Sequence, residues 1–267
     1  MSSLQTLALT AALSVVAALV TAVAADWPVS RQRVQRFADR HDLHLTPDNS
    51  PLIVAYLATT RRWRAAGLAG GLAANTVTNL QHSRIGVSII YLLAGWFAGA
   101  LVAEARVAGL PARRRAASLA PRTLDRYLSR PARRALPWSV LAALLLTAWA
   151  ATTDDGQAGR IVPLIVTPAV TLVVWLTTQR VLNRPQPAAP ADVLAADNAI
   201  RSRSLHAVTA SGATLVLYGA LDQALTAVAG SSGPVVLVML LGGVAVPWFG
   251  WRLATAPWVV RPDPVPA

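Results

Sequence analysis

The stretch RVAGLPARRRAASLAPRTLDRYLSRPARR, residues 106–134, contains nine arginines and a single acid, Asp125. A segment of this kind is either an arm that binds nucleic acid or the basic side of a membrane boundary. The rest of the chain distinguishes these two interpretations. Of its 267 residues 54% are hydrophobic and only 13% are charged, with a mean hydropathy of +0.47. A soluble domain needs more charge to cover its surface, so the composition indicates a membrane protein.

Apolar runs long enough to cross a bilayer recur along the chain, since a spanning helix needs about 20 mainly apolar residues. The run at 205–229 is interrupted by Asp222. The run at 65–80 is short, rich in small residues, and contains Asn75 and Asn79. With both of these included, the sequence predicts an all-α, polytopic transmembrane helical bundle of about seven spans: 4–25, 65–80, 85–103, 135–151, 161–179, 205–229 and 234–251.

The distribution of arginine decides whether 65–80 spans. All 24 basic residues are arginines, and arginine concentrates in short loops on the cytoplasmic side. If 65–80 spans and the N-terminus is outside, 22 arginines lie inside and only Arg84 and Arg160 lie outside. If it does not span, the seven arginines of 26–64 and the nine of 106–134 lie on opposite faces. We therefore predict seven spans with the N-terminus outside and the C-terminus inside.

This topology predicts one transmembrane domain over 1–257, followed by a Pro-rich cytoplasmic tail at 258–267. Its arginine-rich cytoplasmic loops are 26–64, 106–134 and 180–204. A cleaved signal peptide is the alternative for the first 25 residues, because AVAAD resembles a cleavage site. It is disfavoured because MSSLQ carries no positive charge.

Two cytoplasmic segments have narrow apolar stripes at helical spacing. In SRQRVQRFADRHDL, residues 30–43, Ser30 is a candidate N-cap, and the stripe consists of Val34, Phe37, Ala38 and His41. In 106–134 the stripe consists of Leu124, Tyr127 and Leu128. Both stripes predict short helices at the interface, with apolar side chains in the acyl boundary and arginines towards anionic headgroups.

Polar residues near the predicted cytoplasmic ends suggest local ion pairs. In DNAIRSRSLH, residues 197–206, Asp197 and Arg201 are spaced as an i, i+4 pair on a helix that docks on the bundle. Glu104 ends the third span beside Arg106, and we expect the two to form an interfacial ion pair.

Glycines at small-xxx-small spacing occur in two neighbouring spans. They are Gly67 and Gly71 in the second span, and Gly95 and Gly99 in the third. This spacing permits close contact between transmembrane helices and is a packing signal without catalytic content.

Asp222 is the only acid well inside an apolar segment, and buried carboxylates often mark ion or proton paths. The alternative is a structural pair or an aspartate that reaches a wet outer rim. By the predicted topology, several polar residues share its outer half. The candidate intramembrane or outer polar residues are Asp222, Asn75, Asn79, Arg84 and Arg160.

The sequence predicts no catalytic residue, no cofactor and no metal. It contains no cysteine, and it lacks the phosphate-binding loop, the HExxH zinc motif and the GxSxG nucleophile motif. His41 and His44 are three residues apart, but two histidines without a third ligand rarely form a site.

Three stretches carry a resemblance to a known group: LLAGWFAGALVAEAR (92–106), RRRAASLAPRTLDRYLSRPARRALP (113–137) and DNAIRSRSLHA (197–207). With them, most of the chain resembles a group of uncharacterised small actinobacterial multi-pass integral membrane proteins. The resemblance implies residence in the bacterial plasma (inner) membrane and supplies no catalytic residues.

Two function classes stay open. The first is a transport-related protein or the membrane subunit of a larger complex. The second is a non-transporting anchor or sensor whose basic cytoplasmic segments bind anionic lipid or a partner protein. The expected partners are anionic headgroups at the cytoplasmic face, a protein partner, or a second copy of the chain. Nucleic acid is not expected, because topology spreads the arginines over the chain instead of gathering them in one domain.

Overall fold

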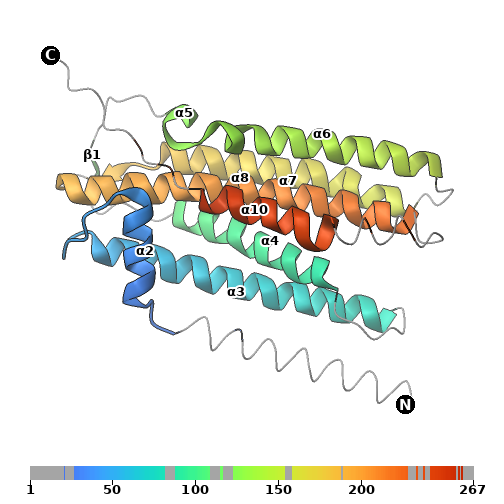
Figure 1. Ribbon diagram of the computed structural model, residues 1–267, viewed down its shortest axis with the longest axis horizontal. Helices are drawn as coiled ribbons and strands as arrows, with labels where there is room; N and C mark the ends of the chain where they lie inside the picture. Colours follow the sequence, from blue (N-terminus) through green and yellow to red (C-terminus); the bar gives the residue numbers. More distant parts are fainter. Residues whose placement is uncertain are drawn as a thin grey trace.

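The computed structural model is helical over almost all of the chain that it describes (Figure 1). It describes the backbone of residues 21, 27–81, 88–108, 115–116, 123–153, 158–187, 189–227, 233, 237, 241–256, 258 and 260. The helices are α2 (Arg31–His41), α3 (Ser50–Gln81), α4 (Ile89–Ala108), α5 (Leu124–Tyr127), α6 (Arg130–Thr153), α7 (Ala158–Asn183), α8 (Ala191–Ala227), the π-helix η1 (Leu241–Ala245) and α10 (Val246–Thr255). Two residues of β1 (Arg115–Ala116) pair antiparallel with β2 (Gln186–Pro187). The predicted all-α class is confirmed.

Four helices in the described part of the chain are long and apolar enough to cross a membrane. They are Ile89–Ala108, Arg130–Thr152, Leu164–Asn183 and Ala191–Leu221, and they correspond to the spans predicted at 85–103, 135–151, 161–179 and 205–229.

The other three predicted spans are not among these four. Residues 65–80 are helical within α3, but they are less apolar than the four. Residues 234–251 are described only in part, as η1 and most of α10. Apart from residue 21, the segment 4–25 lies outside the described residues. Seven spans and their orientation therefore stay predictions.

Helix α8 forms the core of the bundle. It packs against α4, α6, α7 and α10, and 83% of its apolar window is buried. The other three candidate spans are only 22–33% buried, so most of their side chains face outward. Their outer surfaces expose large apolar side chains, including Leu145 at 63% and Ile165 at 61%. So extensive an apolar exterior suits an apolar solvent better than water.

Helices α3 and α4 approach through the glycines that the sequence singled out. A β-carbon on Gly67 would overlap the carbonyl oxygen of Gly95, and one on Gly71 would overlap that of Tyr91. A β-carbon on Gly99 would likewise overlap the carbonyl of Trp63. The predicted close packing of these two segments is confirmed, with backbone resting directly on backbone.

The residues of both apolar stripes are helical except Leu128, which follows α5, but the prediction that the stripes insert into the acyl boundary is wrong. Ser30 does precede α2, and its carbonyl accepts from the backbone of Val34. However, Val34 and Phe37 pack on Ile53 and Ile200. The reason is that α8 begins at Ala191, well before the predicted start of its span at 205, and offers protein surface to α2.

The second stripe is also covered by protein. Tyr127 and Leu128 are buried, and they pack with Leu205 and Leu253 from α8 and α10. Only Leu124, at the start of α5, is exposed. Both stripes therefore fasten the basic segments to the helical bundle.

Candidate functional site

The five polar residues predicted as candidates are placed only in part. Asn75 is buried in α3, and its Oδ1 accepts a 2.9 Å hydrogen bond from the backbone of Ser88, at the start of α4. Asn79 is partly exposed one turn further along α3. Arg84 lies outside the described residues. Asp222 and Arg160 lie in α8 and α7, but their side chains are outside the described part. The association of Asp222 with the other four candidates stays a prediction. Asn75 has a structural role, because it joins α3 to the start of α4.

A buried carboxylate lies at the other end of the bundle, where the arginines gather. Glu104 of α4 is fully buried and accepts hydrogen bonds from the Tyr56 hydroxyl at 3.1 Å and the Ser204 hydroxyl at 2.6 Å. Burial and the adjacent carboxylate raise the pKa of Tyr56, so its phenol stays protonated and donates. The expected pair of Glu104 with Arg106 is wrong, because the Arg106 guanidinium lies 5.1 Å from the centre of the Trp63 ring.

The predicted i, i+4 pair of α8 is confirmed, but it is internal. Arg201 Nη2 lies 3.0 Å from Asp197 Oδ2, and both residues are buried. Arg201 Nη1 also donates to the carbonyls of Val181, Leu182 and Arg184 at 2.8–3.0 Å. These carbonyls end α7 and would otherwise be unsatisfied. Arg201 is therefore a structural cap, and this part of α8 packs inside the bundle instead of docking on its surface.

A serine and a histidine meet in the same region. His206 Nδ1 lies 2.9 Å from the Ser202 carbonyl, which can only accept, so Nε2 accepts from the Ser129 hydroxyl at 3.1 Å. This pairing is typical of an activated serine. However, both residues are buried, and neither lines the groove or the cavity described below. The pair therefore fastens the start of α6 to α8.

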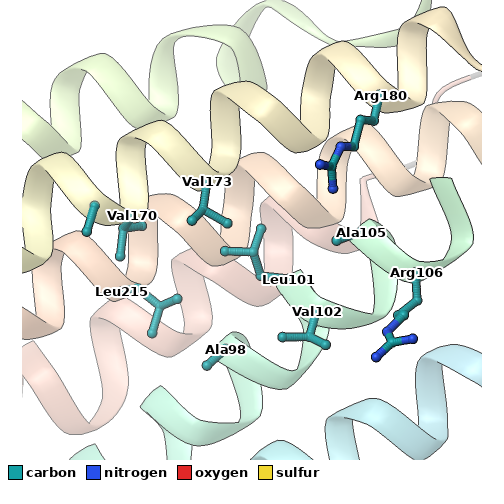
Figure 2. Close-up of a pocket in the computed structure, with 10 residues that line it drawn as sticks. Ala98, Leu101, Val102, Ala105, Arg106, Val170, Val173, Arg180 and Leu215 are labelled. Carbon is teal, nitrogen blue, oxygen red and sulfur yellow. The ribbon is translucent and has the colours of Figure 1, made fainter. Parts of the chain in front are cut away.

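A groove of about 420 Å³ runs between α4 and α7, and we name it the α4/α7 groove. Figure 2 shows its apolar side chains along both helices, with Leu215 of α8 between them. This volume is within the range of about 300–1,000 Å³ that is typical of small-molecule sites. The groove is lined by Ala98, Leu101, Val102, Ala105, Arg106, Ala169, Val170, Val173, Arg180 and Leu215.

The charge in this groove is confined to one end. Arg106 and Arg180 lie beyond the apolar side chains, near the C-terminal ends of α4 and α7 (Figure 2). Both arginines are exposed, and none of the ten described lining residues is acidic. The groove thus combines an apolar channel with a cationic end, a pattern complementary to an anionic amphiphile.

No protein-family model, curated protein or solved structure matches this chain. The resemblance to actinobacterial membrane proteins therefore stays a prediction. Among the residues that the structure describes, no group of three or more histidines and acids is placed to hold a metal ion. The sequence did not indicate the α4/α7 groove, although the positions of Arg106 and Arg180 just after apolar runs were a usable signal.

Proposed function

We propose that this chain is a multi-pass plasma-membrane protein that holds an anionic phospholipid in the α4/α7 groove. It belongs in the second function class left open by the sequence, the non-transporting anchor or sensor. The observation that carries the proposal is an apolar groove ending in two exposed arginines from different helices.

The chemistry of a phospholipid matches this groove at both ends. An acyl chain that leaves the bilayer to lie along Leu101, Val173 and Leu215 exchanges one apolar environment for another, because bilayer and groove are both apolar. Selectivity then comes from the headgroup, since basic pockets between transmembrane helices on the cytoplasmic side bind anionic headgroups. Each arginine near the membrane surface contributes about 1 kcal/mol towards an anionic lipid.

We further propose that the arginine-rich end of the bundle is cytoplasmic. In Figure 1, α2, α5 and the start of α8 lie at this end. Arg106 and Arg180 lie near it, because Arg201 of α8 caps the end of α7. Arginine enrichment on one side supports this orientation.

The orientation predicts opposite labelling of two engineered cysteines. The chain has no cysteine, so Gly156→Cys and Arg115→Cys give single labels without background. We expect an impermeant maleimide added to intact cells to label position 156, and to label position 115 only after the membrane is opened. Labelling of both positions from the same side would contradict the proposed topology.

The lipid proposal predicts a charge-selective loss of binding. We expect the double variant Arg106→Gln/Arg180→Gln to bind phosphatidylglycerol roughly 30-fold more weakly, which is about fivefold for each arginine. Native mass spectrometry of the detergent-purified protein, titrated with phosphatidylglycerol or phosphatidylcholine, measures this change. Binding of phosphatidylcholine should be unaltered, because it has no net charge for the arginines to select.

Arg134→Gln is the matched control for this experiment. Arg134 is an exposed arginine of α6 that does not line the groove, so its loss removes one charge at the same end. We expect it to change phosphatidylglycerol binding by less than about twofold. The lipid proposal fails if this control equals the double variant, or if both lipids are lost together.

Transport is the other class that the sequence left open. It depends on Asp222, whose side chain lies outside the described residues. The described lining of the α4/α7 groove includes both its apolar side chains and its two arginines, so lipid binding is the function that the geometry supports best.

A further inference from the structure

A second cavity, of about 250 Å³, lies beneath α2, and we name it the α2 cavity. Its lining residues come from α2, α3, α8 and α10, and from the residue that follows α10. It shares no lining residue with the α4/α7 groove. In Figure 1, α2 lies across the bundle near the start of α8. The α2 cavity is therefore a separate feature of the arginine-rich end.

Three arginines on one face of α2 line this cavity. Arg33, Arg36 and Arg40 are spaced i, i+3 and i+7, so they share one helical face. The adjacent apolar face, with Val34 and Phe37, is buried against the bundle. The buried face thus fixes the rotation of α2 and the placement of its arginines.

A fourth guanidinium comes from the core helix. Arg203 of α8 lines the same cavity and is partly buried, unlike the three exposed arginines of α2. Glu104 is its acidic electrostatic neighbour, and this carboxylate accepts hydrogen bonds from Tyr56 and Ser204. Glu104 does not line the cavity, whereas four guanidinium groups do, so the lining carries a net positive charge.

The histidine of the cavity adds no charge near neutral pH. Burial lowers the pKa of His41 to about 4. The hydrogen bond between His41 Nδ1 and the Trp258 carbonyl opposes this shift, and the charges of Arg203, His206 and Arg40 add smaller contributions to it. His41 is therefore neutral at pH 7. None of the described lining residues is acidic, so the positive potential of the cavity is not cancelled within it.

We propose that the α2 cavity binds a phosphate-type oxyanion through Arg33, Arg36, Arg40 and Arg203. Guanidinium groups match the geometry of phosphate oxygens and stay charged at every physiological pH. The cavity is smaller than the range of about 300–1,000 Å³ typical of drug-sized ligands, which suits a compact anion. The phosphoryl group comes either from a soluble phosphate compound or from a lipid headgroup.

Pyrophosphate titration of the full-length protein, in detergent free of anionic lipid, tests the soluble source. Isothermal titration calorimetry should show saturable binding that weakens roughly tenfold or more in Arg36→Gln and in Arg203→Gln. Arg36 is exposed, so its variant keeps the test valid if Arg203→Gln fails to fold. Arg31→Gln is the matched control, because Arg31 is an exposed residue of α2 that does not line the cavity. We expect it to bind within about twofold of wild type.

Native mass spectrometry with phosphatidylglycerol tests the lipid source. If pyrophosphate does not bind, but Arg36→Gln lowers retention of phosphatidylglycerol and Arg31→Gln does not, the headgroup is the ligand. The proposal is overturned if Arg36→Gln changes neither pyrophosphate binding nor lipid retention. This failure is distinct from failure of the proposed function, which is tested with Arg106→Gln/Arg180→Gln against its control Arg134→Gln.

Discussion

Replacing Gly67 with alanine is expected to lower the melting temperature of the detergent-solubilised protein by roughly 5–10 °C. The added methyl group would overlap the carbonyl oxygen of Gly95 and the backbone of Gly99. Overpacking costs about 1–3 kcal/mol in a well-packed interior, and backbone atoms yield less than side chains do. We therefore expect a cost near 3 kcal/mol, in spite of the higher helix propensity of alanine.

Gly70→Ala is the matched control for this prediction. It makes the same substitution in the same helix, but apart from the chain neighbours and the local backbone of α3, no heavy atom lies within 4 Å of the added β-carbon. We expect no loss of stability, and a gain of up to about 1 kcal/mol from helix propensity. Circular dichroism at 222 nm or dye-based melting measures both variants. Equal melting of Gly67→Ala and Gly70→Ala would show that α3 and α4 do not meet through these glycines.

The glycine contact also bears on the doubtful segment 65–80. Its hydropathy is low because small residues replace leucine and valine over much of its length. The same small residues let α3 lie directly on α4, and close packing stabilises helix pairs in lipid. The stability of such a segment in a membrane depends more on packing against its neighbour than on its own apolarity. The hydropathy of a single helix does not include this packing contribution.

Local features of the fold could be predicted from the sequence. Runs such as 135–151 and 161–179 identified candidate spans, because apolar length is a property of the segment itself. The spacing of Val34, Phe37 and His41 likewise identified α2, and all three side chains are buried as a helical stripe requires. The partner of that stripe was not predictable, since bilayer and protein interior are both apolar.

The polar interior could not be predicted, because its contacts join distant parts of the chain. Tyr56 and Ser204 both donate to Glu104, although they lie 48 and 100 residues away from it in sequence. Neighbouring residues suggested Arg106 as the partner of Glu104, and only the packing of α3, α4 and α8 shows otherwise. The sequence pointed to Asp222 as the notable acid, whereas Glu104 is a buried carboxylate whose hydrogen-bond partners the structure describes.

Arg201→Gln is expected to destabilise the protein by about 3–5 kcal/mol, the usual cost of removing one partner from a buried ion pair. Arg201 is fully buried, with 0% of its surface exposed to solvent. Its loss leaves Asp197 with only Arg184 as a described ion-pair partner and removes the donor to three carbonyls at the end of α7. We expect a large fall in melting temperature, with the protein recovered in low yield.

Arg133→Gln is the control, because Arg133 pairs with Asp125 on the surface, where an ion pair contributes about 0–1 kcal/mol. Its melting temperature should stay close to wild type. The same assay separates structural arginines from those proposed to bind ligands. Arg106 and Arg180 are exposed, so the variant Arg106→Gln/Arg180→Gln should melt near wild type while it loses phosphatidylglycerol. If Arg201→Gln also melted near wild type, Arg201 would not be a cap of α7.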